Sequence, residues 1–226
     1  MNVDTINSLS RGDAQASFMA KVYTWMTAGL LVTAGVSLAM VSTGAAVALA
    51  ANLPLFIGLI VLELVLVFAY MFLKDSIGFG GSLLLLGAYA ALNGVTFSAL
   101  FAIYGMALAA QAFGITAGMF GALSVFGFVT KRDLSGWGNF LFMGLVGILI
   151  ALVFEFFIAS TAFSFIVSCA AVLVFAGLTA YDTQKIKDMA HTNSNALDGA
   201  LVLYLDFINL FLHILRILAI AQGNND

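Results

Sequence analysis

The feature that most constrains this chain is a series of seven long apolar stretches, each of sufficient length to cross a lipid bilayer. A helix needs about 20 predominantly apolar residues to cross the hydrocarbon core. The 226-residue chain is 63% hydrophobic and only 8% charged, whereas soluble domains carry roughly 25% charged residues. The sequence therefore predicts an all-α integral membrane protein with seven transmembrane helices. The predicted spans are residues 21–43, 53–73, 81–104, 106–129, 139–160, 163–184 and 197–220.

The rest of the sequence is short and polar, and we expect one transmembrane domain preceded by a small arm. Residues 1–20 form the predicted cytoplasmic arm, and residues 21–226 form the single seven-helix domain. Pro54 lies at the start of the second span, where its missing N–H is not needed for helical hydrogen bonding. Gly114 and Gly118 in the fourth span have the spacing that lets helices approach closely in lipid.

The basic residues predict the orientation of the chain. Lys and Arg are enriched in cytoplasmic loops, and seven of the eight basic residues fall on one side if the spans alternate. The N-terminus is therefore predicted to be cytoplasmic, and the C-terminus to lie outside. Arg216, late in the last span, departs from this pattern and leaves open a final segment that re-enters the membrane. The seven consistent residues are Arg11, Lys21, Lys74, Lys131, Arg132, Lys185 and Lys187.

The charge and cysteine content exclude several classes of partner and cofactor. The formal net charge is −3, and no basic patch of the kind that follows a nucleic-acid groove is present. Cys169 is the single cysteine, so an intrachain disulfide and a cysteine-based metal cluster are excluded. We expect the lipid bilayer as the surroundings, no nucleic-acid partner and no tightly bound cofactor.

A polar stripe runs along the last span. Asp206, Asn209 and His213 are spaced three and four residues apart, which places them on one helix face. An ionisable group inside a span costs on the order of 2.5–3.5 kcal/mol and usually marks a function. The stripe is predicted to face other helices, either lining an ion pathway or forming a static network that fixes helix packing.

A second aspartate, Asp182, lies near the end of the sixth span. If Lys185 and Lys187 extend to the membrane interface, the helix continues past Asp182 and its carboxylate can meet that of Asp206. Two adjoining carboxylates in a poorly hydrated site cannot both ionise cheaply, so they share a proton. When both are deprotonated, their oxygens suit Ca²⁺. The sequence thus predicts a pH sensor and a candidate Ca²⁺ site at Asp182 and Asp206.

Two other spans contain ionisable groups. Glu63 and Lys74 are eleven residues apart in the second span and fall on nearly the same helix face, with Tyr70 beside them. This face is a candidate gating element, although Lys74 alone also fits a plain interfacial anchor. Glu155 in the fifth span fits either a second pathway carboxylate or a protonated packing residue.

Three segments resemble the Bax inhibitor-1 (transmembrane Bax inhibitor motif) family. They are residues 177–186 (GLTAYDTQKI), 200–211 (ALVLYLDFINLF) and 93–98 (NGVTFS). The seven-span count agrees along nearly the whole chain, and the short tail and compact loops resemble bacterial members.

The resemblance implies a fold and a function. It implies a last helix wrapped by the other six, and a pH-sensitive calcium leak controlled by an aspartate pair matching Asp182 and Asp206. It also implies roles for Glu63 and Lys74, although Lys74 replaces an arginine of the family pattern and the two residue types are not equivalent. A bacterial inner-membrane location follows, with Ca²⁺ as the transported or weakly bound ion.

Two other classes of function compete with a leak. Some bacterial family members are described as partners of a membrane-bound, ATP-dependent protease, which implies a non-transporting regulator with residues 1–20 as a docking segment. An intramembrane aspartyl protease also has two intramembrane aspartates. However, Asp206 follows Leu203-Tyr204-Leu205 instead of a Gly-x-Gly run, and the only proline is Pro54. We therefore expect that the protein is not an enzyme.

Overall fold

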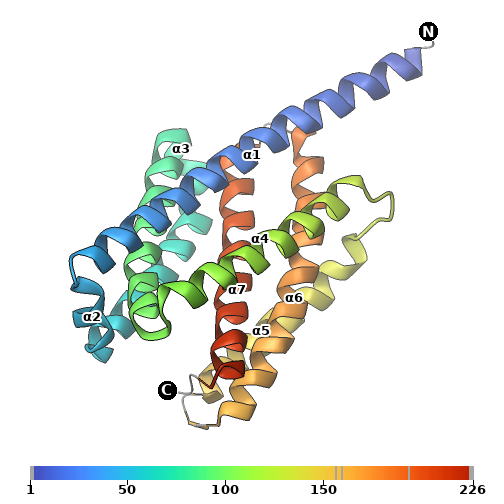
Figure 1. Ribbon diagram of the computed structural model, residues 1–226. Helices are drawn as coiled ribbons and strands as arrows, with labels where there is room; N and C mark the ends of the chain where they lie inside the picture. Colours follow the sequence, from blue (N-terminus) through green and yellow to red (C-terminus); the bar gives the residue numbers. More distant parts are fainter. Residues whose placement is uncertain (1–2, 156, 159, 193, 224–226) are drawn as a thin grey trace. The chain divides into compact units, whose positions relative to one another are not determined.

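The computed structural model describes residues 3–155, 157–158, 160–192 and 194–223, which form helices joined by short connections (Figure 1). Within these residues, seven helical segments are long and apolar enough to cross a membrane. The prediction of an all-α fold with seven transmembrane helices is therefore confirmed. In chain order the elements are α1 (Val3–Ser42), α2 (Ala45–Ala50), α3 (Leu53–Tyr104), α4 (Met106–Val129), η1 (Ser135–Trp137), α5 (Gly138–Glu155), α6 (Thr161–Asp188), η2 (Met189–His191) and α7 (Ala196–Ala221).

The predicted arm is helical from its third residue. α1 is a single helix of 40 residues that contains most of residues 1–20 as well as the first span. Met1 and Asn2 lie outside the described residues. At 1.5 Å per residue the helix is about 60 Å long, which exceeds a bilayer of about 40–45 Å with its headgroups. The segment has no proline, and good helix formers from Ala14 onward continue into the apolar span.

The connection between the first two spans is compact and well capped. Gly44, with φ 76°, follows α1, and the short helix α2 then connects it to the next span. The side chain of Asn52 then accepts a hydrogen bond of 3.1 Å from the backbone N–H of Leu55. Pro54 lies in the first turn of α3, as predicted.

A kink replaces the predicted loop between the second and third spans. α3 runs through residues 74–80 and departs from helical geometry at Gly78, where φ is 62° and ψ is −175°. Glycine adopts positive φ without the penalty of a Cβ atom. The chain therefore changes direction at a single residue, near the start of the segment Ser76–Tyr104 that follows Leu53–Lys74.

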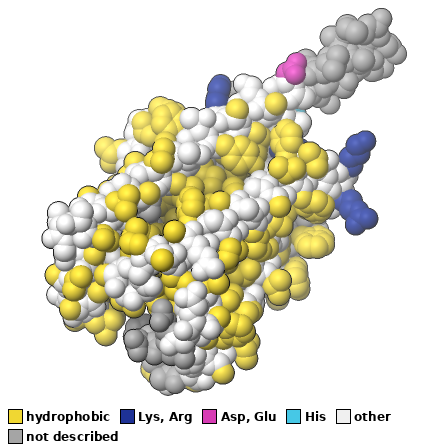
Figure 2. Space-filling model, in the orientation of Figure 1, with side chains coloured by type: hydrophobic (Ala, Val, Ile, Leu, Met, Phe, Trp, Pro, Cys, Tyr) yellow, Lys and Arg dark blue, Asp and Glu magenta, His cyan; other side chains and the backbone are white. Residues whose placement is uncertain are grey.

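Large apolar side chains point outward along the spans. Phe72 and Phe157 are each 81% exposed, and Leu173 is 73% exposed. Figure 2 shows hydrophobic side chains over much of the visible face and few charged ones. Because burying apolar surface away from water contributes roughly 25 cal/mol per Å², these side chains are suited to contact with lipid tails.

The chain divides into two compact units. The first comprises Met1–Met106 with Thr192–Tyr204, and the second comprises Ala107–His191 with Leu205–Asp226. α7 contributes its first turns to the first unit and the remainder to the second. The single domain expected over residues 21–226 stays a prediction.

Hydrogen bonds between helices fasten the first unit. The hydroxyl of Thr33 in α1 lies 2.7 Å from that of Tyr204 in α7 and donates to the carbonyl of Ala90 at 2.9 Å. Ser37 donates to the carbonyl of Gly94 at 2.8 Å. A Cβ atom added to Gly94 would lie 2.7 Å from the carbonyl oxygen of Thr33. The contact of α1 with α3 therefore requires this glycine.

In the second unit, glycines of α4 and α5 allow close packing against α6, and a Cβ atom on Gly144 of α5 would lie 3.0 Å from the Cγ2 atom of Val174. A Cβ atom on Gly127 of α4 would lie 2.3 Å from the carbonyl oxygen of Ala180 in α6. Gly114 and Gly118 have nothing within 4 Å of such an atom. No described residue packs closely against these two glycines, and their role in helix packing stays a prediction.

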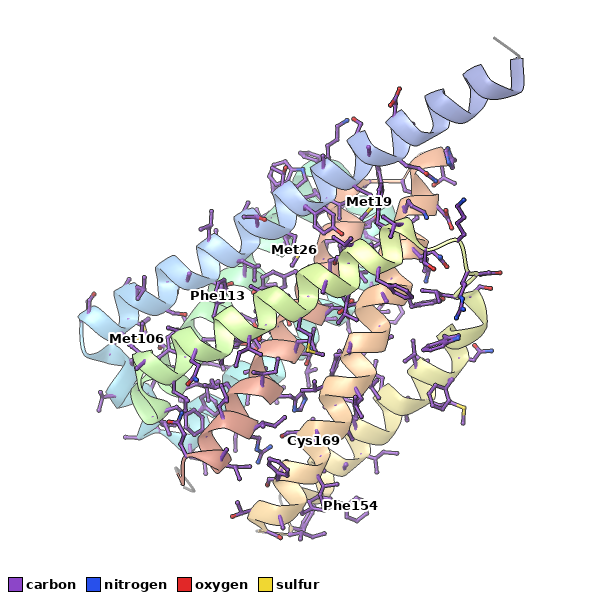
Figure 3. The ribbon with its side chains drawn as sticks, turned by 45° about the vertical axis from the view of Figure 1, so that its right-hand side comes forward. Met19, Met26, Met106, Phe113, Phe154 and Cys169 are labelled. Atoms are coloured by element: carbon purple, nitrogen blue, oxygen red, sulfur yellow. The ribbon has the colours of Figure 1, made fainter. Side chains whose placement is uncertain are left out.

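Aromatic contacts join α4 and α7 within the second unit. The ring of Phe207 lies 5.5 Å from each of the rings of Phe113 and Phe120, between centroids. Figure 3 shows Phe113 on α4. These contacts fix the rotation of α7 next to Asp206.

α7 is the most buried of the seven spans. In its most apolar window 61% of the residues are buried, against 50% for Ser76–Tyr104 and less elsewhere. Its 26 residues form one helix about 39 Å long, which is long enough to cross the hydrocarbon core; that this segment crosses the membrane, and does not re-enter it, stays a prediction. A position at the centre of six helices stays a prediction.

Candidate functional site

Two aspartates of the second unit form the centre of the candidate site. Asp206 of α7 is 5% exposed, and its Oδ2 atom has no hydrogen-bond partner among the described residues. The charge of Asp182 in α6 acts on Asp206, and Lys185 acts on Asp182 in turn. Within the described part of the chain, no direct hydrogen bond joins the two carboxylates. They therefore interact through space, and their role as a pH sensor and Ca²⁺ site stays a prediction.

The position of Asp182 follows from how α6 ends and packs. The helix continues past Asp182 to Asp188, with Lys185 and Lys187 in its last turn, as predicted from the two lysines. The ammonium group of Lys187 donates to the carbonyl of Phe128 at 3.1 Å, and Thr183 donates to Ser124 at 3.4 Å. Together with the close contact at Gly127, these bonds attach α6 to α4 at the level of Asp182.

Gln184 also holds the connection that follows α4. Its Oε1 atom accepts a bond of 2.8 Å from the N–H of Leu134, and its Nε2 atom donates to the carbonyl of Arg132 at 2.9 Å. The backbone N–H of Ser135 donates to the exposed carboxylate of Asp133 at 2.8 Å, and this bond lowers the pKa of Asp133 below its usual value. No role was predicted for Gln184, although it lies in the segment 177–186 that resembles the Bax inhibitor-1 family.

The other polar side chains of the α7 stripe, Asn209 and His213, make their contacts with nearby groups other than Asp206. Asn209 donates to the carbonyl of Leu205 in its own helix at 2.8 Å. His213 is 8% exposed and stacks on Phe175 of α6, with 6.1 Å between ring centroids and 22° between planes. Among the described residues, neither of these contacts involves Asp206, so the stripe is a row of separate polar groups.

The second-span residues Glu63 and Lys74 belong to the first unit and do not contact each other. Glu63 accepts a hydrogen bond of 2.6 Å from the hydroxyl of Thr96. Tyr70 donates to the carboxylate of Asp198, in the first turn of α7, at 2.7 Å. Among the side chains that the structure describes, Lys74 has no ion-pair partner. The gating roles of Glu63 and Lys74 stay predictions.

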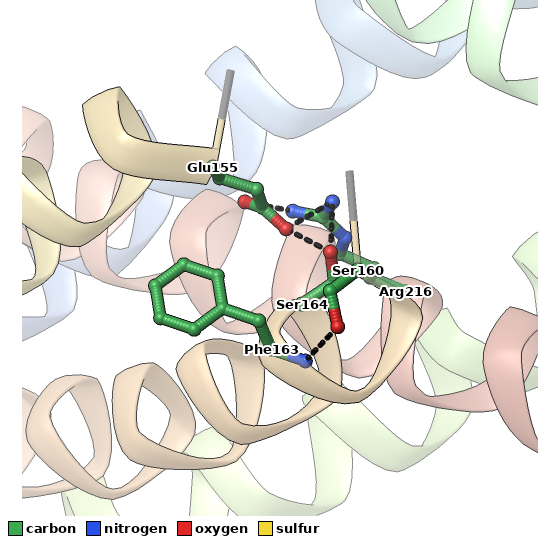
Figure 4. Close-up of polar contacts among 5 residues, drawn as sticks. All are labelled: Glu155, Ser160, Phe163, Ser164 and Arg216. Carbon is green, nitrogen blue, oxygen red and sulfur yellow. Dashed lines mark hydrogen bonds and ion pairs between the residues drawn. The ribbon is translucent and has the colours of Figure 1, made fainter. Parts of the chain in front are cut away.

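An ion pair that the sequence analysis missed joins three helices of the second unit (Figure 4). Arg216 of α7 binds both carboxylate oxygens of Glu155 at the end of α5, at 2.6 Å and 2.8 Å. Ser164 of α6 accepts a hydrogen bond of 3.1 Å from Arg216 and donates to Glu155. Glu155 is therefore a carboxylate with an ion-pair partner, and its role as a second pathway carboxylate or as a protonated packing residue stays a prediction. The opposite charges of Glu155 and Arg216 were the feature of the sequence that could have indicated this ion pair.

No preformed metal centre accompanies these groups in the described residues. In that part of the chain, no three or more His, Cys, Asp or Glu side chains lie close enough together to hold a metal ion. Asp182 and Asp206 supply two carboxylates, and other ligands of a hard cation would be backbone carbonyls or water. Such a set suits a weakly held, passing ion.

The fold and these groups define a class of protein: a multi-pass helical membrane protein with carboxylates buried within its spans. The family described as "Inhibitor of apoptosis-promoting Bax1" matches residues 15–223. The chain belongs to this family, Bax inhibitor-1, as its motifs suggested.

Several bacterial proteins are similar over most of their length. The Inner membrane protein YbhL of Escherichia coli K12 is 45% identical over 211 residues, covering 89% of this chain and 90% of YbhL. An uncharacterized protein of Deinococcus radiodurans is 41% identical over 212 residues and 91% of each chain. The uncharacterized protein YrjE of Lactococcus lactis is 36% identical over the full length of both chains.

Proposed function

We propose that this protein is a pH-sensitive calcium leak channel of the bacterial inner membrane, gated by proton exchange at Asp182 and Asp206. The main support is the environment of Asp206, whose carboxylate is buried with one oxygen unpartnered among the described residues and lies within range of the Asp182 charge. The motifs shared with the family support the same function. The inner-membrane location rests on the description of the similar YbhL protein.

The proposed gate works through repulsion between the two carboxylates. When they share a proton, one negative charge remains, and α6 and α7 can stay close together. Loss of that proton leaves two like charges in a poorly hydrated place, which is unfavourable unless the helices move or a cation enters. Ca²⁺ binds carboxylate oxygens without strict geometry, so it can relieve the repulsion and then leave. The resulting movement is proposed to reach the second span.

The test is Ca²⁺ flux into liposomes as a function of pH. The purified protein is reconstituted with a Ca²⁺ indicator inside, and the variants Asp182→Asn and Asp206→Asn are compared with the unaltered chain. Both substitutions keep the size of the side chain and remove its titration. Asp133→Asn is the matched control, because Asp133 is exposed in the α4–α5 connection.

The expected result is a flux that varies with pH in the unaltered chain and in Asp133→Asn, and does not vary in either site variant. Loss of pH dependence in all three variants would indicate a general effect of substitution. An unchanged flux and pH profile in both site variants would place the gate elsewhere and overturn the proposal.

A second candidate function is a non-transporting regulator that docks onto a membrane-bound, ATP-dependent protease. The length of α1 favours it, because about 60 Å of helix leaves several turns beyond the bilayer for contact with a partner. Deletion of residues 3–11 with co-purification as the readout separates the two functions. A regulator would lose its partner, whereas a leak would keep its Ca²⁺ flux.

A further inference from the structure

The ion pair of Glu155 and Arg216 lies at one end of the set of polar side chains in the second unit. Glu155 is the last residue of α5, Ser164 lies in the first turn of α6, and Arg216 lies near the end of α7. Along α7, Arg216 is about 15 Å from Asp206 at 1.5 Å per residue. Along α6, Ser164 is about 27 Å from Asp182 by the same measure. On α6 the cluster and Asp182 therefore lie near opposite ends of the helix, and on α7 Arg216 and Asp206 lie almost three turns apart.

The α7 stripe leads from the aspartates to this cluster. Asp206, Asn209, His213 and Arg216 are spaced three, four and three residues apart, so they share one helix face. The charges of both Arg216 and Glu155 act on His213. An ion that moved along the stripe would meet the ion pair after His213.

The geometry of the cluster is that of a strong, neutral pair. Arg216 uses two nitrogens on two carboxylate oxygens, the bidentate arrangement that gives the strongest charge-assisted bonds. The side chain of Glu155 is 12% exposed and that of Arg216 is 34% exposed. Arg216 thus occupies the place at the carboxylate that a cation would otherwise take, and it is the more exposed member of the pair.

We propose that Arg216 is a tethered cation that blocks the Glu155 end of this pathway, so that Glu155 attracts passing cations only when the pair opens. The inference rests on the proposed leak function and adds a second gate to it, near the opposite end of α6 from Asp182. It assigns Glu155 as a selectivity residue and Arg216 as its blocker. The permeant class is inorganic cations, with Ca²⁺ as the probe.

A blocking role of Arg216 and a purely structural role of the pair predict different directions of change in cation flux. Arg216→Gln leaves the Glu155 carboxylate free beside Ser164, so cation flux rises. Glu155→Gln leaves an unpaired guanidinium at the same place, so cation flux falls. A unit charge about 4 Å from a passing divalent ion changes the occupancy of that place roughly thirtyfold with the screening of bulk water, and more at a partly solvated site, so the flux should change by at least about tenfold. A structural pair would instead lower or raise flux in the same direction in both variants.

The flux experiment compares four proteins in liposomes with Ca²⁺ as the ion: the unaltered chain, Arg216→Gln, Glu155→Gln and the double variant. The expected order of flux is Arg216→Gln first, the double variant and unaltered chain between, and Glu155→Gln last. Arg132→Gln is the charge-matched control, because it removes one exposed positive charge outside the spans and should leave flux unchanged. Equal changes in the two single variants would overturn the proposal.

A second measurement does not depend on flux. Ser168 is fully buried one turn beyond Ser164 on α6, and Cys169 is the only native cysteine. In a Ser168→Cys, Cys169→Ala background, thiol reagents of opposite charge report access past the pair. We expect Arg216→Gln to favour the cationic reagent and Glu155→Gln to favour the anionic one, with slow reaction of both when the pair is intact.

The flux and thiol-labelling measurements together distinguish a failure of the proposed leak function from a failure of the proposed blocking pair. If the unaltered chain passes no Ca²⁺ but the reagent preference reverses between the single variants, the leak is wrong and the blocking pair stands. If the unaltered chain passes Ca²⁺ and neither flux order nor reagent preference follows the sign of the charge, the leak stands and the blocking pair is wrong. The double variant, which buries no uncompensated charge, ensures that a folded reference exists without the pair.

Discussion

The close contact of α4 with α6 gives a sharp prediction for Gly127→Ala. The new Cβ atom would lie 2.3 Å from the carbonyl oxygen of Ala180 and 3.0 Å from Cβ of Thr183. The nearest obstacle is backbone and cannot rotate away, so the two helices must separate by about 1 Å to restore ordinary contact. Overpacking of this kind costs typically about 1–3 kcal/mol. The separation would also stretch the bond from Lys187 to the carbonyl of Phe128.

The matched control is Gly118→Ala on the same helix. Nothing lies within 4 Å of a Cβ atom at Gly118, so the alanine there should stabilise the helix by up to about 1 kcal/mol. The two variants should therefore differ by about 1–4 kcal/mol, which for a chain of this size corresponds to roughly 2–16 °C in Tm. Thermal unfolding in detergent, followed by loss of the monodisperse peak, measures the difference. Equal Tm values for Gly127→Ala and Gly118→Ala would refute the packing described for α4 and α6.

Two further predictions test the first unit and the orientation of the chain. Tyr70→Phe removes the hydrogen bond to the carboxylate of Asp198 and should lower the free energy of unfolding by about 1.5–3 kcal/mol; a Tm equal to that of the unaltered chain would contradict this. In a Cys169→Ala background, Asp13→Cys should react with an impermeant thiol reagent only from the cytoplasmic side, and Gly223→Cys only from outside. Labelling of both positions from the same side would contradict the predicted topology.

The spans were predictable because lipid leaves the backbone few alternatives. Each N–H and C=O in the hydrocarbon region must be satisfied internally, so a long apolar stretch implies a helix. The charges at Lys74 and Asp75 suggested a loop, since charged residues usually mark span ends. The structure has a kink at Gly78 instead, because one glycine in a left-handed conformation reverses the chain without a loop.

The packing of the spans was less predictable. Spacing of glycines indicates a smooth helix face, as at Gly114 and Gly118, but it does not indicate which face another helix covers. The close approach uses Gly127, which has no such spacing partner in the prediction. The pairing of Glu155 with Arg216 depends on which ends of α5 and α7 come together, and 61 residues of sequence separate the two. Asp182 and Asp206 could be singled out from the sequence because each lies in a segment that resembles a motif of the family.

The kink at Gly78 has a mechanical consequence for the second span. A rigid helix attached through one flexible residue can swing about that point but cannot slide along its neighbour. The segment Leu53–Lys74 contains 22 residues and is about 33 Å long. A tilt of about 10° at the hinge would therefore sweep its far end, near Asn52, through about 6 Å. Small changes near Lys74 would then be amplified on the opposite side of the membrane.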